Sequence, residues 1–215
     1  KEMIYSQRLR FGTSLSFTQK IDKNTLHELK VAGISTVELS FTYDYLMNTI
    51  DFPKNYLDYA KMAQEACVEI WSIHLPFSPY LDISHEIKEL RDITLYTNRT
   101  LIEAAGKSGV KVVVLHPSSE PIAADARPER LRNSRESIEK LKSVCDQYGM
   151  KLAVENLPRT CLCNRADEMI ELLEGTGAGI AFDTNHSLIE ENVSFLSRLI
   201  DSGLKIHTLH ISDYD

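Results

Sequence analysis

The segment KLAVENLP, residues 151–158, is a short apolar run that ends in a carboxylate, Glu155. Five further segments share this pattern of an apolar body followed by an acid or a histidine. They are TVELSF (36–41), EIWSIHLP (69–76), KVVVLHPS (111–118), GIAFDTNH (179–186) and IHTLHISD (206–213). Short runs that are apolar on both faces, such as residues 111–115, are typical of parallel strands covered on both sides. The polar residue therefore marks the carboxyl end of each predicted strand.

Strand patterns alternate with helical patterns along the chain, which favours a parallel sheet with helical crossovers. We expect strands at 10–16, 36–41, 69–76, 111–118, 151–157, 179–185 and 206–212. We expect helices near 22–32, 54–67, 84–108, 128–148, 165–175 and 192–202. No linker or low-complexity stretch interrupts them, so residues 1–215 are predicted to form a single α/β domain.

The predicted architecture is a (β/α)8 TIM barrel, in which all strand carboxyl ends open at one mouth and carry the chemistry. The sequence supplies seven strands, and closure of this barrel needs eight. We therefore expect the 215-residue sequence to lack the last strand and helix of a longer barrel. An open doubly wound sheet is the alternative, but no glycine-rich phosphate loop follows the first strand.

The composition is that of a globular protein, with 43% hydrophobic residues and a formal net charge of −7. No apolar run approaches the roughly 20 residues of a membrane-spanning helix, and the amino terminus lacks the apolar segment of a signal peptide. The acidic balance and the lack of a basic run argue against nucleic acid as a partner. Four cysteines without disulfide spacing favour a reducing compartment, and we predict a cytoplasmic protein. A homo-oligomer is left open.

Three strand ends carry the residues that we expect to bind a divalent metal. Glu155 interrupts a buried strand, where an unpaired carboxylate is costly, so it needs either a metal or an ion pair with a basic residue. Asp183 and His186 form a D-x-x-H pair that lets both side chains face one mouth, with substrate binding as the alternative role for His186. His210 closes the last segment. Mixed carboxylate and imidazole ligands suit manganese, cobalt, magnesium or zinc.

The last predicted strand contains two histidines, and either could be the one that points into the barrel mouth. His207 and His210 are an odd number of positions apart, so we expect them to face opposite sides of the sheet. His210 lies nearer the carboxyl end and is the better candidate, which leaves His207 a packing role. Asp213, just beyond, is expected to orient the His210 ring or to contact a substrate.

His74 and His116 end two neighbouring predicted strands, and a proline follows each within two residues. A single histidine on an apolar strand is usually a core residue, but a pair at the same height indicates groups that bind substrate or a further metal. Glu38 is a weaker candidate for substrate contact, with a structural ion pair as the alternative. Aromatic residues that follow these strand ends are expected either to wall a small polar ligand or to pack within loops: Tyr43, Tyr45, Phe77 and Tyr80.

In this order, the motifs resemble the xylose isomerase-like superfamily of TIM barrels, specifically its sugar phosphate isomerase/epimerase branch. The stretches that carry the resemblance are VELS (37–40), SIHLPFS (72–78), VVLHPSS (113–119), AVENLPR (153–159), AFDTNHS (181–187) and LHISDYD (209–215). The resemblance implies one divalent ion held by Glu155, Asp183 and His210. The family's fourth ligand, a glutamate on the eighth strand, would lie beyond Asp215.

The resemblance further implies a metal-dependent isomerase or epimerase of a small sugar, sugar phosphate or polyol. Glu155 would take a proton from the carbon beside a carbonyl, and the metal would stabilise the enediolate that forms. His186 would steady the substrate oxygens. The residues expected to line the substrate pocket are Glu38, His74, His116 and Asp213. No cluster of basic residues marks a phosphate pocket, and Arg159 is the one candidate contact.

Three alternatives stay open at this point. The related endonuclease IV branch uses more metals, and its additional histidines are matched in part by His74, His116 and His186, so a metal-dependent phosphodiesterase is one alternative. An inosose-type dehydratase begins with the same proton abstraction as the isomerases. A non-catalytic homologue that binds a sugar is the third.

Overall fold

The computed structural model describes residues 10–16, 22–49 and 51–212 of the 215-residue chain. Its strands are β1 (Thr13–Ser16), β2 (Thr36–Ser40), β3 (Glu69–His74), β4 (Val112–Leu115), β5 (Lys151–Glu155), β6 (Gly179–Asp183) and β7 (Ile206–His210). Its helices are α1 (Lys23–Val31), α2 (Tyr43–Met47), α3 (Phe52–Glu65), α4 (Lys88–Lys107), α5 (Arg127–Gln147), α6 (Ala166–Leu173) and α7 (Asn192–Asp201).

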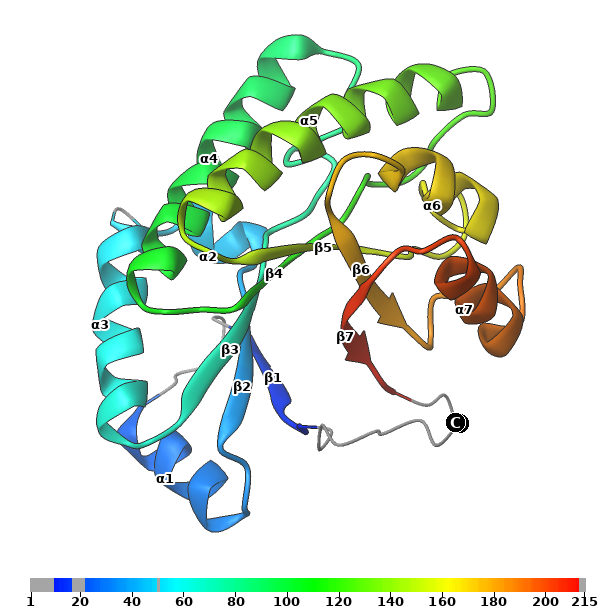
Figure 1. Cartoon of the computed structure of the whole chain (residues 1–215). Helices are drawn as coiled ribbons and strands as arrows, with labels where there is room; N and C mark the ends of the chain where they lie inside the picture. The colour runs from blue at the N-terminus through cyan, green and yellow to red at the C-terminus, as the bar shows by residue number, and fades with distance from the viewer. Residues whose placement is uncertain (1–9, 17–21, 50, 213–215) are drawn as a thin grey trace.

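The seven strands form one sheet in sequence order, and every neighbouring pair is parallel. The sheet is curled, with β1 and β7 at its edges and the long helices on its outside (Figure 1). The predicted α/β barrel class is confirmed, and all strand carboxyl ends point to one mouth. Among the described residues β1 pairs only with β2 and β7 only with β6, so the eighth strand stays a prediction.

Two helical segments differ from the expected pattern. The short helix α2, which the sequence reading missed, is capped by Thr42, whose hydroxyl accepts a hydrogen bond from the Tyr45 amide at 3.2 Å. Helix α4 begins at Lys88, four residues later than predicted, because a turn comes first. In that turn the Asp82 carboxylate accepts hydrogen bonds from the amide and the hydroxyl of Ser84. Local polar side chains therefore redirected the backbone at both places.

The sheet has a thick hydrophobic layer outside and a thin one inside. Side chains such as Ile73, Leu152 and Phe182 point outward, are essentially inaccessible to solvent, and pack against the helices in the large core. The inner face carries a small separate cluster: Val112, Val114, Ala153 and Ala181, with Trp71 packed against it. Because strand residues alternate between faces, Glu155 and Asp183 share the inner face with this small cluster.

Two register shifts interrupt the alternation of side chains. The pairing of β2 with β3 skips Trp71, and the pairing of β6 with β7 skips His207. The His207 ring lies where a side chain on Gly179 would point, 2.4 Å from an added Cβ, and Gly179 has the same inward parity as Ala181. The prediction that His207 and His210 face opposite sides is therefore wrong, because an extra residue in a bulge resets the parity.

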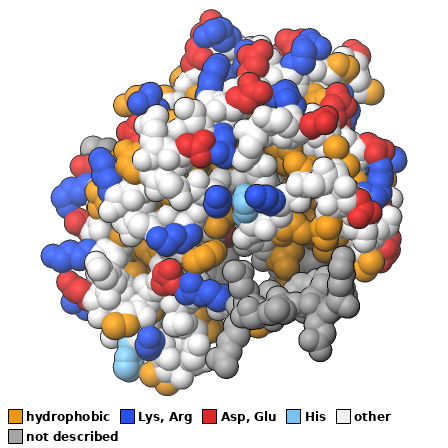
Figure 2. All heavy atoms as spheres, in the orientation of Figure 1, with side chains coloured by type: hydrophobic (Ala, Val, Ile, Leu, Met, Phe, Trp, Pro, Cys, Tyr) orange, Lys and Arg blue, Asp and Glu red, His pale blue; other side chains and the backbone are white. Residues whose placement is uncertain are grey.

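Charged residues of both signs are interspersed over α4 and α5 on the face that Figure 2 shows. Several are ion pairs one helical turn apart, such as Lys88 with Asp92 and Arg99 with Glu103. Pairs of this kind stabilise a helix only slightly and mark a solvated outer surface. Within the described residues, no helix is long and apolar enough to span a membrane.

Candidate active site

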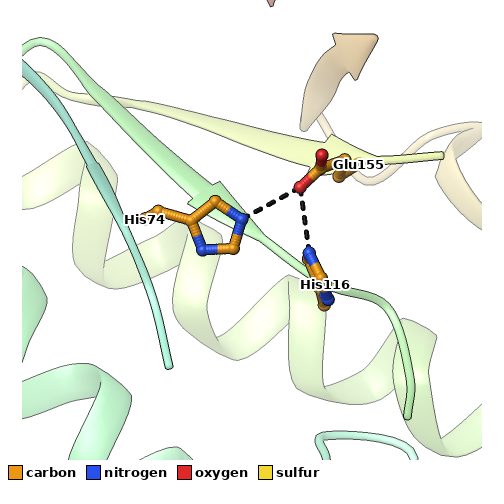
Figure 3. Close-up of side chains that lie close together, drawn as sticks. All are labelled: His74, His116 and Glu155. Atoms are coloured by element: carbon orange, nitrogen blue, oxygen red, sulfur yellow. Dashed lines mark hydrogen bonds and ion pairs between the residues drawn. The ribbon is translucent and has the colours of Figure 1, made fainter. Parts of the chain in front are cut away.

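Glu155 is the centre of a polar cluster at the barrel mouth. It is the last residue of β5, and its side chain is 2% exposed. The ring Nε2 atoms of His74 and His116 each lie 3.0 Å from its Oε2 atom, as Figure 3 shows. The ring Nδ1 of His210 lies 3.0 Å from its other oxygen, Oε1. Three histidines from β3, β7 and the end of β4 thus converge on one buried carboxylate.

Two further carboxylates and a fourth histidine surround this centre. His210 reaches Glu38 through its Nε2 atom, which lies 3.2 Å from Glu38 Oε1. The Nδ1 atom of His210 lies 3.8 Å from Asp183 Oδ2, since Asp183 and His210 are register partners in β6 and β7. His186 approaches through Nδ1, which is 3.5 Å from Glu155 Oε1 and 4.0 Å from Asp183 Oδ2.

Asn156 is a buried part of the site that the sequence reading missed. Its side-chain oxygen accepts a hydrogen bond from the Asp183 amide at 2.7 Å, and its side-chain nitrogen donates to the Asp183 carbonyl at 3.0 Å. Its backbone carbonyl is 2.9 Å from His186 Nδ1. Asn156 therefore fixes the end of β6 and the His186 ring together. The feature of the sequence that could have indicated Asn156 is its side-chain amide, directly after Glu155 in the predicted strand 151–157.

The charges at the centre are strongly coupled. Burial alone would raise the pKa of Glu155, but the hydrogen bonds from His116, His210 and His74 outweigh it and hold that pKa well below the usual range. Burial would likewise lower the pKa of His210, yet the hydrogen bonds and charges of Glu155 and Glu38 raise it to about 11. At neutral pH the structure therefore holds a carboxylate and an imidazolium in contact.

The pKa values of the remaining groups shift in different directions, because the effect of burial is offset by neighbouring charges to a different extent at each group. Burial lowers the pKa of His116 to about 4 despite its contact with Glu155, so this ring is neutral. Burial also opposes protonation of His74, but the hydrogen bond to Glu155 raises its pKa overall. The pKa of Asp183 is raised by burial. The cluster thus contains a neutral imidazole, the form of histidine that binds metals.

The donor atoms fit a divalent metal. Two groups each bring three ligand atoms within 4.8 Å of one another: His74, His116 and Glu155, and Glu155, Asp183 and His186. Carboxylate and imidazole are the donors that zinc, manganese and cobalt accept in proteins. Glu155 belongs to both groups. His210, the third ligand expected from the sequence, lies 3.0 Å from Glu155 and 3.8 Å from Asp183, but the group that contains these two carboxylates has His186 as its histidine.

The described residues account for every predicted site position except Asp213, which lies outside them. The Glu38 carboxylate accepts a hydrogen bond from the Ser72 hydroxyl at 2.7 Å. The sequence did not indicate Ser72 as a partner of Glu38. Phe77 stacks on the His116 ring, whereas Tyr43 contacts Tyr80 away from the histidines. Tyr45 packs against Phe41. The candidate phosphate contact Arg159 is paired with the Glu120 carboxylate.

A sequence profile described as xylose isomerase-like TIM barrel matches residues 26–215, so the chain belongs to this family. One relative is the uncharacterized protein MJ1311 of Methanocaldococcus jannaschii, which is 28% identical over 168 residues. That match covers 75% of this chain and 57% of the relative, so the chain spans little more than half of that protein.

Solved structures share the same fold at low sequence identity. A D-tagatose 3-epimerase-like protein superposes with a TM-score of 0.78 at 21% identity, over 95% of this chain and 77% of that one. The D-psicose 3-epimerase of Clostridium cellulolyticum H10, solved with D-tagatose, gives a TM-score of 0.69 at 14% identity, over 93% and 84% of the two chains. At these identities the likeness shows the barrel fold, and activity has to be argued from the site itself.

Proposed function

We propose that this chain carries the active site of a metal-dependent isomerase or epimerase that acts on a small sugar, sugar phosphate or polyol. The observation that carries the proposal is the buried Glu155 carboxylate, held anionic by three histidine rings at 3.0 Å. A carboxylate in this state is ionised at neutral pH, as a metal ligand and a general base must both be. The family match and the sugar epimerases among the structural neighbours support the same class.

The proposed reaction begins with removal of a proton from the carbon beside a carbonyl. A divalent ion held by Glu155, Asp183 and His210 would polarise the carbonyl oxygen and offset the negative charge that develops. Glu155 takes the proton. In an isomerisation it returns the proton to the neighbouring carbon, whereas an epimerisation needs a second acid to deliver a proton to the same carbon from the opposite face of the substrate. His186, which Asn156 holds in place through its backbone carbonyl, contacts the substrate oxygens.

The remaining groups bind and orient the substrate in this proposal. Glu38 is fixed by Ser72 and by the His210 ring, so its carboxylate has a defined position at the mouth. His74 and His116, which both contact Glu155, line the substrate pocket. The low exposure of Glu155 keeps bulk water from the base, which strengthens its electrostatic interactions with the substrate.

The experiment is exchange of substrate hydrogen for deuterium from heavy water, followed by NMR. The full-length protein with manganese is offered a panel of ketoses, aldoses and inosose-type polyols, with Glu155→Gln as the matched variant. Exchange in the parent protein that is absent in the variant supports proton abstraction, and the labelled carbon identifies the substrate class. Metal binding without exchange on any sugar would contradict the proposal.

Hydrolysis of a phosphate ester is a second candidate, favoured by the second three-donor group. An isomerase of the proposed kind needs one ion, whereas His74, His116 and Glu155 offer donors for another ion beside the Asp183 group. Paired metals that share a carboxylate are typical of phosphoester hydrolases. Two ions per chain together with cleavage of bis(p-nitrophenyl) phosphate would favour this candidate, and one ion without cleavage would exclude it. The net charge of −7 weighs against a nucleic-acid substrate, because proteins that bind nucleic acids neutralise its phosphates with basic residues.

A further inference from the structure

We propose that Phe77 is a positioning residue that fixes the orientation of the His116 ring within the donor group of His74, His116 and Glu155, a role that rests on metal binding by that group, the second metal site considered above. The two rings are stacked, with their centroids 3.8 Å apart and an angle of 27° between their planes. Phe77 also lies near the His74 ring, at a centroid distance of 5.6 Å. It is thus the aromatic neighbour of both histidines that bind the same oxygen of Glu155.

The other three histidines of the site are each oriented by a second polar contact. His74 Nδ1 is 2.9 Å from the Leu75 carbonyl, and His186 Nδ1 is 2.9 Å from the Asn156 carbonyl. His210 lies between two carboxylates. In His74 and His210 the second contact lies at the ring nitrogen remote from the one that faces Glu155, where such contacts normally hold a metal-binding histidine in the required tautomer and direction. In His186 it lies at Nδ1, the nitrogen that also faces Glu155.

His116 lacks this second polar contact among the described residues. Its polar partner is Glu155, through Nε2, and its ring also meets the His74 ring edge to face at a centroid distance of 4.8 Å, so no second hydrogen bond fixes the plane of the ring. The stacked Phe77 ring constrains that plane, because with the centroids 3.8 Å apart a His116 ring turned out of its plane would collide with Phe77. Phe77 therefore supplies by packing what the Leu75 carbonyl supplies to His74 by hydrogen bonding.

The segment that carries Phe77 is tied to the segment that carries His116. Asp82, in the same loop as Phe77, is almost completely buried. Its carboxylate accepts a hydrogen bond from the Ser119 amide at 2.9 Å, three residues beyond His116, and pairs with Arg130 on α5. The loop is thus held against the start of the next βα connection, so the stacking geometry is maintained by buried polar contacts away from the rings.

The exposure of Phe77 separates positioning from a purely structural role. Phe77 is 47% exposed, so its removal takes little apolar area out of the core and should leave the fold intact. Tyr80 is a matched control, since it lies in the same loop, is 65% exposed, and contacts Tyr43 rather than a histidine. A positioning role predicts that Phe77→Ala and Tyr80→Ala unfold at similar temperatures but differ at the site.

The first measurement is NMR of the histidine ring nitrogens in the metal-free, full-length protein. In Phe77→Ala we expect the His116 signals to broaden or split, because the ring samples several orientations, while those of His186 keep their shape. Tyr80→Ala should leave the His116 signals unchanged. A single sharp His116 signal in Phe77→Ala, as in the parent protein, would overturn the proposal.

The second measurement is a titration with cobalt(II), followed by its visible absorption. We expect Phe77→Ala to bind about tenfold more weakly, within the range that such orienting contacts contribute. Phe77→Tyr should restore the affinity because it keeps an aromatic face, and Phe77→Leu should not. Equal cobalt affinity in the parent protein and Phe77→Ala would contradict the proposal. If the parent protein bound no cobalt, the proposed metal site would fail, and the NMR result would still decide the role of Phe77.

Discussion

The two faces of the curled sheet differ in what they bury. The outer face packs large side chains such as Leu152 and Phe182 against the helices, with almost no exposure. The inner face has a small cluster centred on Ala153 and Ala181 and then, one step further along the same strands, Glu155 and Asp183. The packing of large side chains therefore lies on the outer face and the candidate site on the inner one, although residues that point to the two faces are adjacent in the chain.

The largest expected effect follows from changing the inner face at its centre. Glu155→Gln keeps the size of the side chain but removes the charge that both three-donor groups share. We expect deuterium exchange into the substrate to fall by at least about 100-fold, the contribution typical of a positioned base, and metal affinity to fall with it. Isotope exchange and calorimetric metal titration measure the two effects. If Glu155→Gln kept both the deuterium exchange and the metal affinity of the parent protein, Glu155 would be neither the base nor a metal ligand.

A substitution on the outer face should lower the stability of the fold and leave metal binding unchanged. Leu152→Ala, on the same strand, leaves a cavity beneath the helices, and we expect the free energy of unfolding to fall by about 2–5 kcal/mol. Metal affinity of the folded protein should be unchanged. Urea unfolding and metal titration of the same sample test the separation. Weaker metal binding by folded Leu152→Ala would show that the two faces are coupled.

Metal binding should in turn stabilise the whole fold through the inner face. A ligand that binds only the native state adds about 2.7 kcal/mol to the free energy of unfolding at 100 times its dissociation constant. We expect a higher unfolding temperature with manganese or zinc, lost after chelation and absent in Glu155→Gln. The same increase in the Gln variant would place the ion elsewhere.

A smaller effect concerns protons rather than stability. Glu155 and Glu38 raise the pKa of His210 to about 11, so its ring carries a proton at pH 7 in the metal-free protein. A histidine must be deprotonated to bind a metal. We therefore expect the binding of an ion to release a proton and the affinity to fall as the pH is lowered. Calorimetry in buffers of different ionisation enthalpy measures this release, and a binding heat independent of the buffer would argue against His210 as a ligand.

The sequence predicted the fold well because both kinds of strand signal were local. Apolar runs and the following polar residue placed the six strands from β2 to β7, and β1 was also expected, with differences confined to the strand ends. Asp82 and Thr42 caused the misplaced start of α4 and the missed α2, because the choice between helix and turn depended on their side-chain hydrogen bonds. The bulge at His207 was also unpredictable, since alternation assumes a regular pairing with the neighbouring strand.

The candidate site was predicted in its residues but less well in its arrangement. Glu155 was expected to bind a metal with Asp183 and His210, and the three lie close together, but His186 is the histidine in the donor group with both carboxylates, so the expected ligand set stays a prediction. It also places His74 and His116 directly on Glu155. That convergence depends on the curvature of the sheet, which turns side chains at the ends of β3 and β5, the two neighbours of β4, toward one another. This curvature leaves no trace in the spacing of residues.

The most direct test of this account is anomalous diffraction from crystals of the protein grown with manganese or zinc. The account predicts an ion about 2.0–2.2 Å from a Glu155 oxygen, with donors from Asp183 and at least one histidine of the cluster. An ion bound elsewhere, with Glu155 still hydrogen-bonded to His74, His116 and His210, would contradict it.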